Sequence, residues 1–190
     1  MSYYSTKKVL FSTDLEKVTL ILFNYLWLYD IIIQNSSINK NLQVYVMDLK
    51  LRELTLKNEI LQVYEIYKHC MFMPTEEKFN NKVDLFLNDI FVKIFACFEQ
   101  DKIVGIMLVS FKEQKKIEII GIAVDVSARG KGIGSYMINQ VINNYGLLFV
   151  YAETDNDAIG FYGKNGFNIM EFSETYDGET VVRYKCELTK

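Results

Sequence analysis

The chain has very little proline, histidine and cysteine for its length. Among 190 residues there are one proline, one histidine and three cysteines. Cys70, Cys97 and Cys186 are widely spaced and form no CxxC pair, and His69 is the only histidine. A zinc site or a disulfide framework lacks the donors it needs, so we expect no metal and a reducing, cytoplasmic location.

The chain also lacks an excess of positive charge and an apolar run of membrane-spanning length. The formal net charge is -3, which gives no general attraction to nucleic acid or to anionic membranes. The apolar stretch 18–33 includes Asn24 and Asp30 and is shorter than the roughly 20 residues that a spanning helix needs. The first residues lack the basic region and cleavage site of a signal peptide. We therefore expect no nucleic acid and no membrane as a partner.

Apolar and aromatic residues, by contrast, are abundant. Half of the chain is hydrophobic, with 13 tyrosines and 13 phenylalanines, which indicates a folded protein of one substantial core. The pattern divides it into an N-terminal helical extension, residues 1–41, and a domain over residues 42–190. In the extension, residues 15–33 are apolar on most of a helix circumference, which predicts packing on the domain or on a second subunit.

Residues 117–144 contain the most specific pattern in the sequence. They predict a strand (117–124), a short turn, a glycine-spaced loop (129–134) and an amphipathic helix. Glycines let backbone N–H groups turn toward one point, and the following helix adds its unpaired N–H groups and positive dipole end. The loop therefore predicts an anion site suited to a pyrophosphate, with Arg129 and Lys131 at its rim.

The remaining elements are predicted from periodicity and turn residues. Before the loop we expect a strand (42–48), two helices (54–67 and 75–88) and a hairpin (93–99 and 102–111). After it we expect a strand (147–152) parallel to the strand before the loop, a short helix opening at Glu153 and ending at Gly166, and two last strands (167–172 and 181–188).

Two motifs resemble those of the GNAT superfamily of acyl-CoA-dependent N-acyltransferases. Arg129, Gly132 and Gly134 match the phosphate-binding pattern Gln/Arg-x-x-Gly-x-Gly/Ala. We align a second family motif, Asn-x-x-Ala-x-x-Phe-Tyr-x-x-x-Gly-Phe, with residues Asn156 to Phe167. Two long motifs in the right order are more specific than either alone. The likeness covers about residues 42–188.

The resemblance implies an α/β (α+β) fold of the GNAT type. It has a mixed, mostly antiparallel central sheet with one splayed parallel strand pair, and helices on both faces. Pantetheine of acetyl-CoA, the implied co-substrate, lies in the splayed gap and the pyrophosphate on the glycine loop. The implied cofactor-binding residues are Ile122, Ala123, Val124, Arg129, Gly130, Lys131, Gly132, Ile133, Gly134 and Asn156.

The resemblance also implies the chemistry, which is transfer of an acetyl group to a primary amine by direct attack. Tyr162 matches the tyrosine that protonates the departing thiolate, and Glu118 matches a glutamate that some members use as base through water. Glu118 lies an even number of steps from Ile122 and Val124, so we expect these three side chains on one face of the strand. Glu153, at the end of the following parallel strand, is the other carboxylate that could act as the base.

Other functions stay open from the sequence alone. The chain could be a noncatalytic acyl-CoA sensor or scaffold. It could also be a dinucleotide-binding oxidoreductase fragment, because Gly130-x-Gly132 begins a GxGxxG pattern, although Ser135 holds the third glycine position. The acceptor is a small-molecule or peptide amine whose identity the sequence leaves open. A homodimer through the N-terminal helix or a sheet edge is a further expectation.

Overall fold

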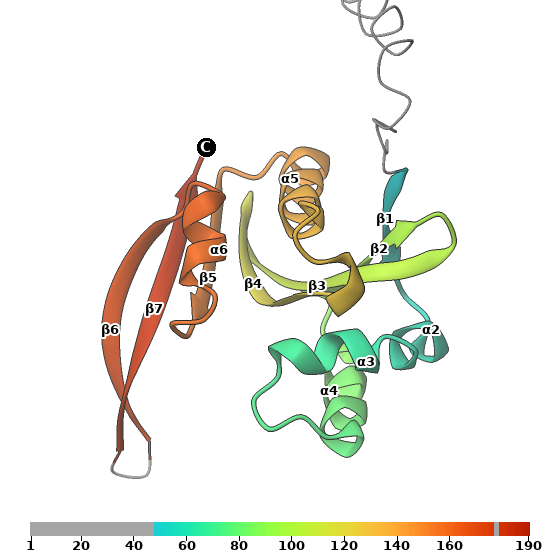
Figure 1. Cartoon of the computed structure of the whole chain (residues 1–190), viewed down its shortest axis with the longest axis horizontal. Coiled ribbons are helices and arrows are strands. Elements are labelled where there is room, and N and C mark those ends of the chain that lie inside the picture. Colours follow the sequence, from blue (N-terminus) through green and yellow to red (C-terminus); the bar gives the residue numbers. More distant parts are fainter. Residues whose placement is uncertain (1–47, 177–178) are drawn as a thin grey trace, which may run out of the picture. The chain divides into compact units, whose positions relative to one another are not determined.

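The computed structural model describes residues 48–176 and 179–190 (Figure 1). The predicted helical extension, its boundary at residue 42 and nearly all of the predicted strand 42–48 lie outside the described residues. Asp48, the last residue of that predicted strand, precedes the first strand of the structure.

The described residues form seven strands, five α-helices and two short 3-10 helices. In chain order these are β1 (Leu49–Leu54), α2 (Lys57–Leu61), α3 (Tyr64–Tyr67), η1 (Lys68–Cys70), α4 (Glu76–Asn88), β2 (Val92–Glu99), β3 (Lys102–Glu113), β4 (Lys116–Val124), η2 (Val126–Ala128), α5 (Ile133–Tyr145), β5 (Phe149–Thr154), α6 (Ile159–Lys164), β6 (Asn168–Tyr176) and β7 (Glu179–Thr189).

The strands form one sheet in the order β1-β2-β3-β4-β5-β7-β6. Neighbouring strands are antiparallel except for β4 and β5, which are parallel. The exception follows from the connection, because α5 carries the chain back to the end of the sheet where β4 begins, whereas the short turns β2–β3 and β3–β4 reverse its direction. The mixed, mostly antiparallel sheet with one parallel pair confirms the predicted fold class.

The parallel pair separates soon after it forms. β4 and β5 pair only from Lys116↔Phe149 to Ile119↔Ala152. Beyond this point β4 stays paired with β3 as far as Val124, while β5 turns away with its partner β7. The wedge between residues 120–124 of β4 and the end of β5 is called the fork below.

Helices cover both faces of the sheet. One buried cluster joins the sheet to α5 and α6 and includes Met137, Val141 and Tyr162. The other joins β1–β4 to α2, α3 and α4 and includes Tyr67 and Phe79. The two clusters place α5 and the α3–α4 helices on opposite faces of β4.

Two predicted helix starts are wrong for the same physical reason. Leu54 was expected in a helix but ends β1, where it is buried and pairs with Ile94. Glu153 was expected to open a helix but continues β5 opposite Lys185. In both places strand pairing in the folded sheet overrides local helical spacing. The predicted helix 54–67 is also divided into α2 and α3.

Candidate active site

The glycine loop ends in the unpaired first turn of α5. Gly130 and Gly132 have left-handed backbones with φ of 77° and 78°, a conformation that glycine adopts without strain. Gly132 is the N-cap of α5, and no side chain caps the helix there. The first N–H groups of α5 and its dipole are therefore free to bind an anion such as a pyrophosphate. Arg129 and Lys131 are exposed beside them.

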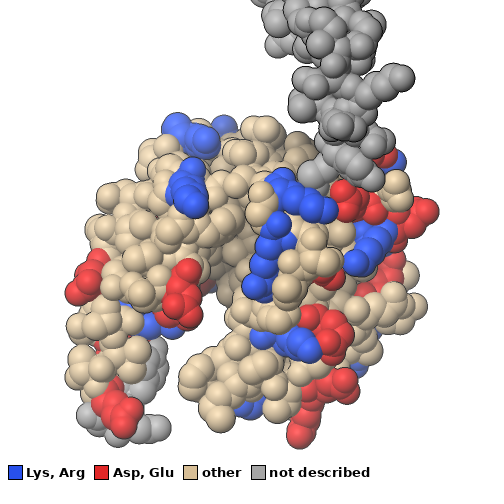
Figure 2. Space-filling model, in the orientation of Figure 1, with Lys and Arg blue, Asp and Glu red and all other residues tan. Residues whose placement is uncertain are grey.

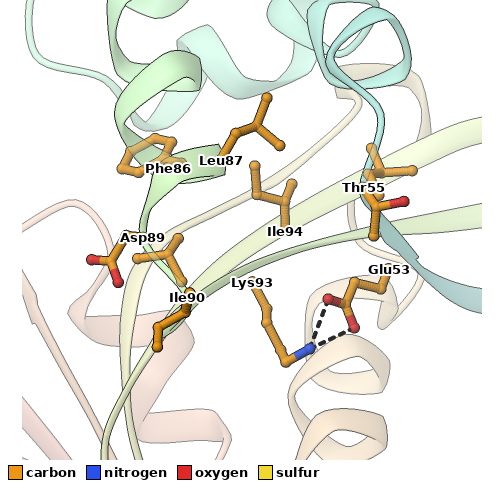
Figure 3. A pocket seen from close by; sticks show the side chains of 10 residues that line it. Glu53, Thr55, Phe86, Leu87, Asp89, Ile90, Lys93 and Ile94 are labelled. Atoms are coloured by element: carbon orange, nitrogen blue, oxygen red, sulfur yellow. Dashed lines mark hydrogen bonds and ion pairs between the residues drawn. The ribbon is translucent and has the colours of Figure 1, made fainter.

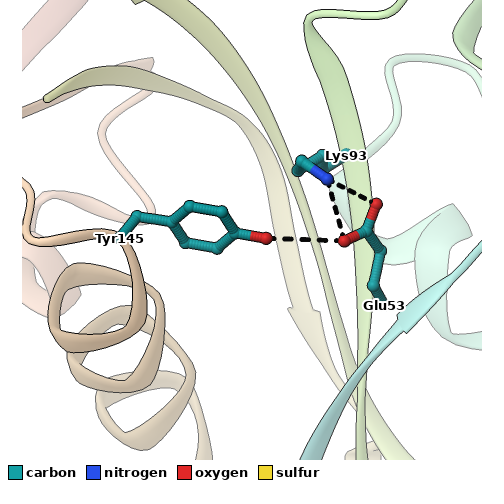
Figure 4. A network of polar contacts seen from close by, with 3 residues as sticks. All are labelled: Glu53, Lys93 and Tyr145. Atoms are coloured by element: carbon teal, nitrogen blue, oxygen red, sulfur yellow. Dashed lines mark hydrogen bonds and ion pairs between the residues drawn. The ribbon is translucent and has the colours of Figure 1, made fainter. Parts of the chain in front are cut away.

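Two tyrosine hydroxyls fix α5 against the first strand. Tyr136 donates a hydrogen bond to the carbonyl oxygen of Leu49 over 2.7 Å. At the other end of the helix, Tyr145 donates to Oε2 of Glu53 over 3.4 Å, and Lys93 holds both oxygens of that carboxylate (Figure 4). The bond to Glu53 raises the pKa of Lys93. These contacts fix the N-terminus of α5 relative to the sheet.

The free edge of β4 presents main-chain groups to the fork. The N–H of Asp125 donates to the carbonyl of Val104, so the main chain of Asp125 faces β3. Because consecutive residues of a strand alternate in direction, Ala123 also faces β3 while Ile122 and Val124 face the fork. The Val124 carbonyl accepts a bond from Arg129 Nε over 3.1 Å. Ile122 and Val124 thus direct main-chain groups into the fork, whereas Ala123 directs none there, and the pantetheine contacts of these residues stay a prediction.

A β-bulge corrects the expected face of Glu118. Val109 pairs with Ile119 and Leu108 with Gly121, so Ile120 is an extra residue in β4. Ile119 and Ile122 therefore contact the same α5-side cluster although an odd number of steps separates them. The prediction that Glu118 shares a face with Ile122 and Val124 is wrong, because the bulge reverses the alternation. Glu118 lies on the face that carries α3.

Glu118 is half-buried and held by two partners. Lys112 Nζ lies 2.7 Å from its Oε2, and the Tyr151 hydroxyl donates to the same oxygen over 3.2 Å. The bond to Glu118 raises the pKa of Lys112. Because both contacts use Oε2, the second oxygen keeps its lone pairs for a water or an amine. The competing carboxylate, Glu153, is exposed at the end of β5.

Tyr162 is buried where α6 packs on the sheet. Its ring makes edge contacts with Phe161 and Phe167, with centroids 5.2 Å apart in each pair. Burial raises the pKa of its hydroxyl well above the ordinary value, with smaller contributions from the thiols of Cys186 and Cys70. The hydroxyl therefore stays protonated at neutral pH, the state that a proton donor requires.

Part of the site is supplied by α3 and η1, where the sequence analysis did not single out Tyr67. A Cβ on Gly121 would lie 3.2 Å from the Cys70 thiol and 3.2 Å from the Tyr67 ring, so both residues cover β4 at the fork. The Cys70 thiol donates a hydrogen bond to the carbonyl oxygen of Tyr67 over 3.1 Å, and burial raises the pKa of the Tyr67 hydroxyl, with a smaller contribution from Cys70. Tyr67 has the helical spacing of a core residue, and no motif marks it.

Asn156 occupies a different position from the one expected. It lies two residues before Ala158, one fewer than in the family motif, so Asp155 holds the motif position. Ala158 is the N-cap of α6, and Asp155 accepts a hydrogen bond from the N–H of Asp157. Asn156 is exposed and is not a helix cap. Its contact with the pantetheine arm stays a prediction.

A separate cavity of about 320 Å³ lies where α4, β1 and β2 meet (Figure 3). Its lining includes Phe86, Leu87 and Ile94, with Glu53 and Lys93 at one side. Strand β3 stands between these strands and β4, so the cavity is not part of the fork. In the described ranges, no cluster of His, Cys, Asp and Glu could hold a metal, and no helix there is long and apolar enough to cross a membrane.

The mixed sheet, the fork and the glycine loop before the uncapped α5 together define the fold of an acyltransferase. The chain belongs to the acetyltransferase (GNAT) family, whose family model matches residues 60–167. The family assignment leaves no support for the dinucleotide-binding alternative, which also requires a predominantly parallel sheet. No curated protein sequence matches the chain.

Solved structures with this fold include several acetyltransferases. A GNAT family acetyltransferase from Elizabethkingia anophelis with acetyl-CoA bound is 17% identical, with 75% of this chain and 99% of that chain covered and a TM-score of 0.56. A variant of spermidine N-acetyltransferase from Vibrio cholerae is 14% identical (74% and 93% covered, TM-score 0.59). Ard1 from Thermoplasma volcanium is 21% identical (74% and 97% covered, TM-score 0.57). At these identities the likeness shows the fold.

Proposed function

We propose that the protein is an N-acetyltransferase that moves the acetyl group of acetyl-CoA to a primary amine by direct attack. The observation that carries this proposal is the free edge of β4 at Ile122 and Val124, which runs from the fork toward the uncapped N-terminus of α5. One site thus offers main-chain groups for a pantetheine arm and an anion seat for a pyrophosphate. The neighbour crystallised with acetyl-CoA supports this choice of co-substrate.

The glycine loop and the free edge of β4 bind different parts of the coenzyme. N–H groups of residues 130–134 bind the pyrophosphate, and Arg129 and Lys131 add positive charge. Ile122 and Val124 bind the pantetheine amides as a further strand would. An N–H of this edge polarises the thioester carbonyl and stabilises the oxyanion that develops there.

Two side chains, Glu118 and Tyr162, serve the transfer itself. Glu118, acting through a water molecule, takes a proton from the ammonium group so that the neutral amine can attack the carbonyl carbon. The new C–N bond forms as the carbon–sulfur bond breaks, and Tyr162 gives its proton to the departing thiolate. The nitrogen, which still carries the extra proton of the attacking amine, releases it through water to the Tyr162 phenolate, so that the amide, the free thiol and the neutral tyrosine result. Cys70 and Tyr67 close the α3 side of the fork and exclude water from the reacting atoms.

Titration calorimetry with acetyl-CoA and a coenzyme-release assay over a panel of amines test the proposal. We expect binding, turnover with at least one amine, and a fall in kcat of roughly 10²-fold in Tyr162→Phe with unchanged affinity for acetyl-CoA. Tyr64→Phe, a tyrosine outside the fork, is the matched control. Absence of binding would refute the site, whereas binding without turnover would favour the acyl-CoA sensor.

Comparison of Glu118→Gln with Glu153→Gln tests the base. If Glu118 removes the proton, only its substitution lowers kcat strongly, and activity recovers as pH rises because a larger fraction of the amine is then neutral. An equal loss in both variants would assign deprotonation to water alone or to both carboxylates.

A further inference from the structure

Strand β7 extends past its neighbour β5 and leaves one of its own edges open. β5 pairs with β7 only as far as Thr154↔Tyr184, whereas β6 pairs with β7 up to Tyr176↔Glu179. Residues 179–183 therefore have β6 on one side and, among the described residues, no strand on the other. At about 3.3 Å per residue this edge is roughly 16 Å long.

The open edge lies on the side of the fork. In the sheet order β5 stands between β4 and β7, so the edge that β5 leaves free faces toward β4. Figure 1 shows the β6–β7 hairpin extending beyond the end of β5, with the connection between η1 and α4 across the opening. In the space-filling view the opening is a hollow in the surface between these two parts (Figure 2).

Arg183 adds an unpaired donor to this edge. Its Nε atom is buried and has no hydrogen-bond partner within the described part of the chain. A buried N–H without a partner is destabilising. Because Nε is enclosed, a carbonyl oxygen of a bound molecule would satisfy it after the Arg183 side chain changes rotamer on binding. Val181 and Val182, on the two faces of the same edge, expose apolar side chains that a neighbouring strand would cover.

The opposite side of the hollow also exposes apolar groups in a fixed conformation. In the connection from η1 to α4, Phe72 is 88% exposed. Met73 next to it has a left-handed backbone with φ of 44°, which is strained for a residue other than glycine. Lys78 Nζ donates to the Met73 carbonyl over 3.1 Å and holds this conformation. Strain of this kind is often kept where a surface binds a ligand.

We propose that the acceptor is a polypeptide that adds to the open edge of β7 as an extended strand, with its amino terminus directed to the fork. The proposal rests on the N-acetyltransferase function proposed above. A strand edge recognises main-chain N–H and C=O groups, which small amines lack. An edge of this length suits four or five residues, whose side chains would contact Val181, Val182 and Phe72 and whose carbonyl would meet Arg183.

A series of acceptors tests the length and the main-chain contacts. Leucine amide is compared with unblocked peptides of two to six residues that begin with apolar residues. We expect kcat/KM to rise about tenfold or more and to level off at four or five residues. N-methylation of alternate peptide nitrogens should lower kcat/KM about tenfold, and methylation of the intervening ones should have little effect, because alternate N–H groups face the edge.

A kcat/KM that does not change with length, or a preference for a small polyamine, would overturn the peptide proposal while leaving the acetyltransferase intact. If no amine at all is acetylated, the proposed function fails instead. The two failures are therefore distinguishable in one set of assays.

Arg183→Met tests the donor on the protein side. It should lower the ratio of kcat/KM for the pentapeptide to that for leucine amide about five- to tenfold, mainly through the KM of the peptide. Arg183→Lys keeps the charge but not the Nε–H and should behave likewise, while Arg52→Met on β1 should leave the ratio unchanged. Thermal unfolding checks that each variant folds. An edge occupied by a second copy, seen as a dimer that Arg183→Met dissociates, would contradict the proposal.

Discussion

At the scale of single residues, the half-buried Cys70 thiol at the fork makes stability fall at alkaline pH. Burial raises the pKa of Cys70 from 9.0 to about 12. Below pH 9 the thiol is protonated in both the folded and the unfolded chain, and its contribution to stability is fully present. Between pH 9 and 12 the unfolded chain releases this proton and the folded chain retains it, so the free energy of unfolding falls as pH rises.

Substitution of Cys70 by serine should reduce this dependence. The serine hydroxyl does not ionise in this range and can still donate to the Tyr67 carbonyl, the partner of the thiol. We expect the slope of unfolding free energy against pH, measured by urea unfolding between pH 8.5 and 10.5, to be shallower by up to one proton, about 1.4 kcal/mol per pH unit. Identical slopes in the two proteins would show that the thiol ionises normally in the fold.

Substitution by alanine should change the free energy of unfolding in opposite directions at two glycines that differ in backbone conformation. Gly132 and Gly160 both have open space where a Cβ would be placed. Gly132→Ala places a side chain on a left-handed backbone and should cost about 1–2 kcal/mol. Gly160→Ala lies within α6 and should stabilise by about 0.5–1 kcal/mol. Urea unfolding measures both, and destabilisation by both would contradict the backbone explanation.

At the scale of elements, Gly134 allows α5 and α6 to pack closely. A Cβ at this position would lie 2.8 Å from the Phe161 ring. Gly134→Ala should therefore destabilise by about 1–3 kcal/mol, because the ring must move within a packed cluster. Addition of Phe161→Leu should recover part of the loss, which a double-mutant cycle of unfolding free energies would show as a favourable coupling. If the two substitutions lower the free energy of unfolding additively, the contact between residue 134 and the Phe161 ring is not the cause of the destabilisation.

The elements of the sheet and the loop were largely predictable, while details that depend on pairing partners were not. Local residue types mark the strand before the loop, the glycines and α5, and these predictions are confirmed. The bulge at Ile120 leaves no local signal, because it arises from the register with β3. For the same reason the sequence did not show which face Glu118 occupies, nor that Tyr67 and Cys70 cover Gly121.

At the scale of the whole described domain, the sheet consists of two parts joined by few strand contacts. β1–β4 and β5–β7 share only the four residue pairs between β4 and β5. The buried cluster under α5 and α6 extends across both parts and joins them by side-chain packing. A coenzyme bound along the fork would add main-chain bonds between the parts at the place where the sheet has none.

Hydrogen exchange can locate those bonds by residue. In the free protein the amides of Ile122 and Val124 face the fork and should exchange faster than those of Ala123 and Asp125, which face β3. Saturating acetyl-CoA should slow amide exchange at Ile122 and Val124 by 10-fold or more. The exchange rates of Ala123 and Asp125 should change much less. At a concentration 100 times the Kd, the ligand should also raise the unfolding free energy by about 2.7 kcal/mol. Uniform slowing of all four amides would indicate global stabilisation alone, because only a ligand hydrogen-bonded along the edge of β4 protects alternate residues.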